Sequence, residues 1–272
     1  MNRKRDRKRA DSNPPKSSKW LVDGFCWYSR GLLRKQFQSM GFLGTEKLKS
    51  IPEHHSTIVF ANHASWWDPI VAMMCQSHYM SKRTLFAPID AEQLENYAVL
   101  KKMGFYGVRL QSFSGAHQFL ETSNKLLANP STSIWITPEG RFCDVRDHEQ
   151  PLMPGLAHLV SKLNHTTVIP LALEYSFWDD SRPHVFGQFG DHINCEQAEL
   201  DGKSACKELL TSALRKTQRE LASAVIKRDP HSFNYLLSSH AKRLSWYDFA
   251  RKWAAWLKGR SFDPRHSASL KR

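Results

Sequence analysis

From about residue 55 to residue 230, short apolar runs rich in β-branched or aromatic residues alternate with segments of helical spacing. The runs stand at 57–61, 105–110, 133–137, 167–173 and 184–189, and the helix-like segments at 66–76, 114–128, 154–163 and 204–227. Such alternation is typical of a parallel sheet connected by crossover helices. We therefore predict an α/β fold, a single domain with a largely parallel, mixed central sheet flanked by helices, plus amphipathic terminal helices.

The two ends of the chain differ from this alternating part. The first residues, MNRKRDRKR, are basic, and Pro14 and Pro15 follow them, which predicts a disordered tail. Apolar residues recur at helical spacing near both ends. We expect four parts: a disordered basic tail (1–19), an amphipathic N-terminal helix (20–44), the α/β domain (45–230) and a C-terminal amphipathic extension (231–272).

Both terminal helices combine apolar stripes with basic neighbours. The N-terminal stripe consists of Leu21, Phe25, Tyr28 and Leu32. The C-terminal stripe consists of Trp246, Phe249, Trp253, Trp256 and Leu257. Aromatic residues beside basic ones suit a membrane interface, where indole rings lie at headgroup level. They also suit a helix that packs its aromatic side chains on the domain, and both alternatives stay open at this point.

The charge of the chain indicates an anionic partner. Lys and Arg number 39 against 26 Asp and Glu, which gives a formal net charge of +13. Nucleic acid, an anionic membrane surface or a phosphorylated substrate would all fit. For the basic N-terminal run, a solvated tail or attraction to anionic lipid explains the charge as well as nucleic acid does. We expect an anionic membrane surface and no nucleic-acid partner.

Other features of the sequence bear on location. No apolar stretch reaches the roughly 18–20 residues that a spanning helix needs, and the basic N-terminus lacks the apolar core of a secretory signal. The five cysteines are scattered without a C-x-x-C pair, which fits a reducing compartment. We expect a peripheral protein at the cytoplasmic face of a membrane, without a transmembrane helix.

The first apolar run leads into NHASWWD at 62–68, which contains His63 and Asp68. Ser65 and Asp68 have the spacing of a capping box, which would start a helix near Trp66 and place His63 at the exit of the strand. The imidazole and the carboxylate could then meet, and the carboxylate would fix the tautomer and stabilise the imidazolium. The alternative is a structural pair that holds the turn, and the context favours chemistry.

The tetrapeptide PEGR at 138–141 follows the run at 133–137 directly. A strand that ends in this turn would bring Glu139 and Arg141 to the same sheet edge as His63, where ligands bind in open α/β sheets. Arginine is a natural phosphate clamp. Taken alone, this tetrapeptide is better interpreted as a surface turn with its own ion pair.

Together with two further segments, these motifs resemble a known family. GFYGVR at 104–109 is a glycine-punctuated strand that ends in Arg109, and VIPLAL at 168–173 is an apolar strand that carries Pro170. In order and spacing, the four segments resemble the four blocks of the glycerolipid (lysophospholipid) acyltransferases, over about residues 45–225. Residues 62–68 resemble the N-H-x-x-x-x-D block, and residues 138–141 the P-E-G-T-R block.

The resemblance implies transfer of a fatty acyl group from acyl-CoA or acyl-carrier protein to the hydroxyl of a lysophospholipid such as 1-acylglycerol-3-phosphate. His63 would be the general base and Asp68 would hold it in position. The implied substrate-binding residues are Glu139, Gly140, Arg141 and Arg109. Arg141 and Arg109 would hold the acceptor's phosphate, and Glu139 would orient Arg141 or the free hydroxyl of the acceptor. Backbone N–H groups at the start of the helix at 66–76 would stabilise the oxyanion.

Two departures from the family pattern concern the acceptor. The third block lacks the threonine between Gly140 and Arg141, and Arg109 falls one residue short of the usual register. Both positions belong to the acceptor-phosphate side of the family's site. A non-phosphate lipid acceptor therefore stays open, as does an inactive basic membrane-binding protein on the same scaffold.

Other catalytic signatures are missing from the sequence. It contains no G-x-S-x-G elbow, phosphate-binding loop, dinucleotide fingerprint or H-E-x-x-H. His54 and His55 are interpreted as a polar lead-in to the strand rather than a metal site. We expect no metal and no cofactor other than the acyl thioester co-substrate.

Overall fold

The computed structural model describes residues 15–109, 112–194 and 202–238. The strands are β1 (Ser39–Leu43), β2 (Ser56–Ala61), β3 (Thr84–Asp90), β4 (Phe105–Val108), β5 (Thr132–Ile136), β6 (Thr166–Ser176), β7 (His184–Phe189), β8 (Ile193–Asn194) and β9 (Asn234–Ser238). The α-helices are α1 (Lys19–Gln36), α2 (Asp68–Tyr79), α3 (Ala91–Asn96), α4 (Phe113–Leu127), α5 (Pro154–Val160) and α6 (Gly202–Lys227). Short 3₁₀ turns η1 (Thr45–Ser50), η2 (Ala98–Met103) and η3 (Pro230–Ser232) complete the described elements.

The strands form one mixed sheet in the order β4-β3-β5-β2-β6-β7-β1-β9, with β8 pairing with β6. The pairs β2–β5, β2–β6, β3–β4, β3–β5 and β1–β7 are parallel, whereas β6–β7, β6–β8 and β1–β9 are antiparallel. This arrangement confirms the predicted α/β fold with a largely parallel, mixed sheet. β2 lies in the middle of the parallel part, between β5 and β6.

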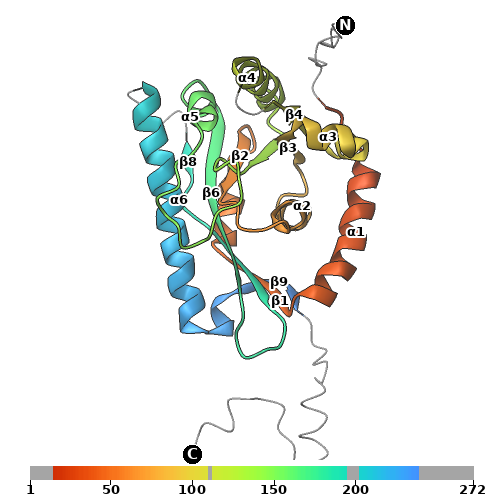
Figure 1. The fold of residues 1–272 in the computed structure, drawn as a ribbon, viewed down its shortest axis with the longest axis vertical. Helices are drawn as coiled ribbons and strands as arrows, with labels where there is room; N and C mark the ends of the chain where they lie inside the picture. Colours follow the sequence, from red (N-terminus) through yellow and green to blue (C-terminus); the bar gives the residue numbers. More distant parts are fainter. Residues whose placement is uncertain (1–14, 110–111, 195–201, 239–272) are drawn as a thin grey trace, which may run out of the picture.

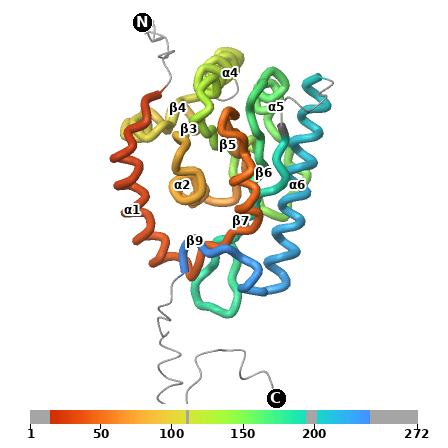
Figure 2. The backbone as a smooth tube through the Cα atoms, turned by 180° about the vertical axis from the view of Figure 1, so that it is seen from behind, coloured from red at the N-terminus to blue at the C-terminus, as the bar shows by residue number. Residues whose placement is uncertain are grey.

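Helices cover both faces of the sheet, and the alternating side chains of the central strands are buried on both sides. Val59 and Ala61 of β2 pack into a cluster with α1 and α2, whereas Ile58 and Phe60 pack into a cluster with α4, α5 and α6. Figure 1 shows α1 and α2 on one side of the strands and α5 and α6 on the other, and Figure 2 shows the same division from behind. Burial on both faces explains why the strand sequences are continuous apolar runs.

Each of the five predicted strands and four predicted helices has a counterpart within a few residues. The prediction missed β1, β3, α3, β8 and β9. β3 was missed because it contains Pro88, which argues against a central strand. The proline is tolerated because β3 pairs with β5 only over Thr84–Phe86 and with β4 only from Ala87 onward, so that no β5 bond is lost at Pro88.

The sheet includes strands from outside the expected 45–230 segment. β1 belongs to the part assigned to the N-terminal helix and pairs in parallel with β7, while β9 follows α6 and pairs with β1. The stripe predicted on the C-terminal extension and most of the basic tail lie outside the described residues. None of the helices in the described ranges is both long and apolar enough to cross a membrane.

Helix α1 contains the predicted N-terminal stripe, of which Leu21 and Phe25 pack against the core of the domain, as one of the two alternatives expected. Its buried face, with Cys26 and Leu33, packs on the domain beside α2. A second face exposes Trp20, Trp27 and Tyr28, and the two tryptophan residues are 78% and 81% accessible. The helix therefore packs on the domain and also presents aromatic side chains to solvent.

Candidate active site

His63 and Asp68 meet at the carboxyl end of β2. His63 follows the strand by two residues, and Asp68 is the first residue of α2. The Nδ1 atom of the imidazole lies 2.8 Å from Oδ2 of Asp68. The carboxylate is buried, with 3% of its side chain accessible, whereas the imidazole is 19% accessible. The ring therefore contacts a buried carboxylate on one nitrogen and remains reachable from solvent.

The turn between His63 and Asp68 forms one of the two hydrogen bonds of the predicted capping box. The carboxylate of Asp68 accepts the backbone N–H of Ser65 at 3.0 Å, but the Ser65 hydroxyl accepts from Trp67 rather than from Asp68. The N–H of Asp68 donates to the carbonyl of Ser65. Because these three N–H groups are bonded within the turn, they do not serve as the oxyanion donors expected at the helix start.

Tyr175 of β6 holds the other oxygen of Asp68. Its hydroxyl donates to Oδ1 of Asp68 at 2.6 Å. Burial, and then the nearby Asp68 carboxylate, raise the pKa of Tyr175 far above its ordinary value, so that the phenol stays protonated and donates. With Ser65, His63 and Tyr175 as partners, the Asp68 carboxylate is fixed in orientation.

Glu139 lies at the same sheet edge as His63, as predicted, but its side chain has a different partner. Its side chain is 1% accessible and pairs with Arg215 of α6 at 2.9 Å. Its second oxygen accepts the backbone N–H of His63 at 2.8 Å. The expectation that Glu139 orients Arg141 is therefore wrong for this structure. A buried carboxylate needs a partner that is itself desolvated, and Arg141 is exposed whereas Arg215 is buried.

The PEGR turn places Arg141 near the imidazole. Gly140 has φ 66°, and a Cβ there would meet the Met153 sulfur at 2.4 Å, so the turn requires glycine. The N–H of Cys143 donates to the carbonyl of His63 at 2.8 Å, and the ring of Phe142 lies 4.3 Å from the imidazole between centroids. The loop that carries Arg141 is thus attached to the backbone of His63.

The two predicted phosphate-binding arginines are not equally close to the dyad. The guanidinium of Arg141 is exposed and donates to the side chain of Gln150, whose backbone carbonyl accepts from Arg215. Arg109 is exposed after β4, which lies three strand positions from β2, or about 14 Å across the sheet. The structure therefore joins the loop that carries Arg141 to His63 and leaves Arg109 further along the same edge.

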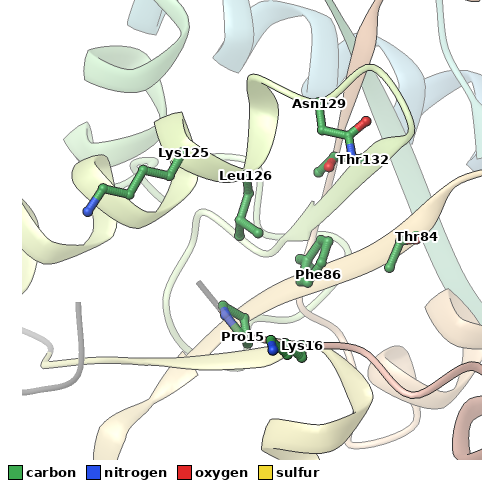
Figure 3. Close-up of a pocket in the computed structure, with 8 residues that line it drawn as sticks. All are labelled: Pro15, Lys16, Thr84, Phe86, Lys125, Leu126, Asn129 and Thr132. Atoms are coloured by element: carbon green, nitrogen blue, oxygen red, sulfur yellow. The ribbon is translucent and has the colours of Figure 1, made fainter. Parts of the chain in front are cut away.

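A pocket at the opposite edge does not include these residues. Pro15, Lys16, Thr84, Phe86, Lys125, Leu126, Asn129 and Thr132 line a cavity of about 520 Å³. Figure 3 shows Thr84 and Thr132 at the starts of their strands, with Pro15 and Lys16 approaching from the N-terminal segment. Thr84 and Thr132 begin β3 and β5, so this cavity lies at the amino ends of the strands, away from His63.

Two residues of the site were missed from the sequence, Tyr175 and Arg215. Tyr175 lies near the end of a strand predicted to stop at residue 173. Arg215 lies on α6, and in the sequence it comes 42 residues after residue 173, the end of the last motif. The signal for Arg215 is a single basic residue on the apolar face of α6, beside Leu214 and Gln218, which are both buried. Such a residue requires a buried acidic partner.

We expect Arg215→Met to lower the free energy of unfolding by about 3–5 kcal/mol, because it leaves the Glu139 carboxylate buried without its partner. Urea denaturation would measure the change. Arg219→Met, at an exposed position of the same helix, is the matched control and should stay near wild type. Combining Arg215→Met with Glu139→Gln should recover part of the loss, and no recovery would contradict the pairing.

Comparison with known proteins supports the resemblance of the sequence motifs to an acyltransferase. Residues 43–174 match a family model described as Acyltransferase, and the match contains both His63 and the PEGR turn. The crystal structure of the 1-acyl-sn-glycerophosphate (LPA) acyltransferase PlsC from Thermotoga maritima superposes with a TM-score of 0.52 at 15% identity, covering 75% of this chain and 81% of that chain. No match to a curated protein sequence is found. Residues 43–174 are therefore identified as an acyltransferase domain with its motifs at the carboxyl edge of the sheet, and the chain shares its fold with PlsC.

Proposed function

We propose that the protein transfers a fatty acyl group from an acyl thioester to the hydroxyl of a lysophospholipid such as 1-acylglycerol-3-phosphate, with His63 as the general base. The observation that carries the proposal is the buried Asp68 carboxylate 2.8 Å from a solvent-reachable imidazole. The structural relative PlsC is a 1-acyl-sn-glycerophosphate acyltransferase, and we propose an acceptor of the same kind for this protein.

The proton path follows from the orientation of the ring. With Nδ1 held by Asp68, Nε2 is the nitrogen that removes the proton from the acceptor hydroxyl. The oxygen then attacks the thioester carbonyl, the C–S bond breaks as the ester forms, and the thiolate leaves and takes up a proton. Asp68 stabilises the imidazolium that forms in between. No serine or cysteine nucleophile is needed for this route.

Glu139, Tyr175 and Arg215 act as positioning residues in this proposal. Tyr175 fixes the carboxylate that holds the imidazole. Glu139 accepts the backbone N–H of His63, and Arg215 donates to Glu139 and holds it in place. Catalysis by general base requires the donor and acceptor atoms within hydrogen-bond reach, so this support bears directly on the rate.

Arg141 is the proposed contact for the acceptor's phosphate. Its guanidinium is exposed on the loop whose Phe142 packs on the imidazole, so that an anion bound there would lie beside the reacting hydroxyl. Arg109 is a second, more distant candidate on the same edge. The missing threonine in the third block keeps a non-phosphate lipid as the alternative acceptor. An inactive binding protein would not need the His63–Asp68 geometry.

Both substrates are amphiphiles, so we place the protein on an anionic membrane surface. The support is the net charge of +13 together with the exposed Trp20 and Trp27 of α1. These tryptophans share one side of the helix because they are seven residues apart. Arg34 and Lys35 at the end of α1 would meet anionic headgroups. We also propose that the protein attaches at the cytoplasmic face of the membrane and that its donor is acyl-CoA or acyl-carrier protein.

We expect purified protein to release free thiol from an acyl thioester in the presence of mixed lysophospholipids, and the lipid product to be identified by mass spectrometry. His63→Ala should lower kcat by about 10²–10⁴-fold, because it removes the general base. His117→Ala, an exposed histidine on α4, is the matched control. Near-normal turnover by His63→Ala would contradict the mechanism. A product formed only from lipids without phosphate would select the alternative acceptor.

Arg141→Ala should raise the KM for the phosphate-bearing acceptor and change kcat less, because a charge-assisted contact to the phosphate is worth about 1.5–3 kcal/mol. Steady-state kinetics at varied acceptor concentration would measure this. Arg146→Ala is the matched control, since Arg146 lies in the same loop and pairs with Asp144. An unchanged KM in Arg141→Ala would remove Arg141 from the acceptor site.

We expect the protein to pellet with anionic vesicles more than with neutral ones and to be released by salt, because its basic residues contribute to binding. Replacing both Trp20 and Trp27 by Gln should reduce the bound fraction several-fold, since indole rings stabilise interfacial binding. Ile226→Gln, at an exposed apolar position on α6, is the control. Equal partition into neutral and anionic vesicles would contradict the electrostatic part.

A further inference from the structure

Three histidines come together at the amino edge of the sheet, opposite the dyad. His54 and His55 precede β2, and His165 precedes β6, which is the parallel neighbour of β2. Their possible ligand nitrogens all lie within 4.8 Å of one another. Within the described ranges, no other group of histidine, cysteine or acidic side chains is dense enough to hold a metal ion.

The loops that carry these histidines are fixed by backbone contacts. The N–H of His55 donates to the carbonyl of Pro52 at 3.1 Å and closes a tight turn around His54. The N–H of Ser56 donates to the carbonyl of His165 at 3.0 Å and joins the two loops. The guanidinium of Arg83 donates to the carbonyls of Pro52 and His55. The three imidazoles are therefore presented by a rigid framework.

His55 has the arrangement typical of a metal-binding histidine. The ring is buried, and Nδ1 lies 3.0 Å from the hydroxyl of Thr167. When this hydroxyl accepts from Nδ1–H, the lone pair of the ring is on Nε2. Histidines that bind metals commonly have the second nitrogen hydrogen-bonded in this way, which fixes the ring and its tautomer.

The backbone of His165 provides a separate indication. Its φ is 53°, in the left-handed region that glycine adopts without strain and that other residues seldom adopt. Residues in such conformations gather at functional sites. An imidazole at this position is kept at a conformational cost, next to two other imidazoles.

We propose that His54, His55 and His165 bind a divalent transition metal ion, with Zn²⁺ as the best-fitting class. Three neutral imidazoles and a water would complete a tetrahedral site with Zn–N distances of about 2.0–2.1 Å. His54 and His165 are exposed and line a cavity of about 380 Å³, which leaves room for that water. Zinc binding would require the ligand nitrogens, which lie within 4.8 Å of one another, to approach further by rotation of these two exposed side chains.

The nearby charges set the expected strength of the site. Arg83 is positive and lies behind the His55 carbonyl, so it opposes a dication, while Glu53 in the turn is negative and exposed. No carboxylate belongs to the proposed ligand set, so the bound ion would keep its full charge. We expect affinity in the micromolar range rather than that of a buried structural zinc.

The test uses the full-length protein without an affinity tag, after treatment with a chelator. Calorimetric titration with ZnCl₂ should show one saturable site, and Co²⁺ should give the visible absorption of a tetrahedral complex. His54→Ala and His165→Gly should each weaken Zn²⁺ binding more than about tenfold, as expected for the loss of a ligand. Glycine is chosen at 165 because it accepts the φ of 53°. Zn²⁺ should raise the Tm of the wild type but not of these variants.

His117→Ala is the matched control, because His117 is an exposed histidine outside the cluster, and it should bind Zn²⁺ as the wild type does. Circular dichroism in the absence of metal confirms that each variant is folded. If His165→Gly fails to fold, His54→Ala, in an exposed turn, decides the question. No saturable binding by the wild type would overturn the proposal, as would unchanged binding by a folded His54→Ala.

Discussion

The position of the His63 backbone depends on one buried carboxylate. Glu139 accepts the N–H of His63 and pairs with Arg215, so that it joins the end of β2, the end of β5 and helix α6. The register explains how they meet: Phe60 aligns with Ile136, and His63 and Glu139 each come three residues later. Because this charge is buried, it must keep its partner, and the backbone of His63 is held as a consequence.

The site divides its support between two carboxylates with different tasks. Glu139 contacts the backbone of His63, whereas Asp68 contacts its ring. Asp68 in turn is held by Tyr175, whose raised pKa keeps the hydroxyl a donor. The main chain and the imidazole are thus oriented by separate carboxylates, and Nε2 of the ring is not the atom that bonds Asp68.

The predictable parts of this site are those set by short stretches of chain. His63 and Asp68 are five residues apart at a strand end, so their contact follows from one turn, and PEGR comes directly after a recognisable strand. The contacts of Tyr175 and Arg215 depend on packing between elements distant in sequence, which no local pattern encodes. Part of the expected oxyanion site is excluded for a related reason: the side chains of Ser65 and Asp68 accept the N–H groups of Trp67 and Ser65 within the turn.

Strand β6 connects the two edges of the sheet. It begins next to His165, passes Thr167 beside His55, bonds Asn62 through Leu173 and ends near Tyr175 beside Asp68. Its register with β2 runs from Ser56–Thr166 to Ala61–Leu171, and a slip of one residue would turn every side chain to the opposite face. An ion bound by His54, His55 and His165 at the amino ends of β2 and β6 could therefore stabilise the pairing of the two strands but could not change its register. Metal binding would then change the stability of the β2–β6 pair and leave the geometry of His63 and Asp68 unchanged. This is the behaviour of a structural metal and not of a regulator of acyl transfer.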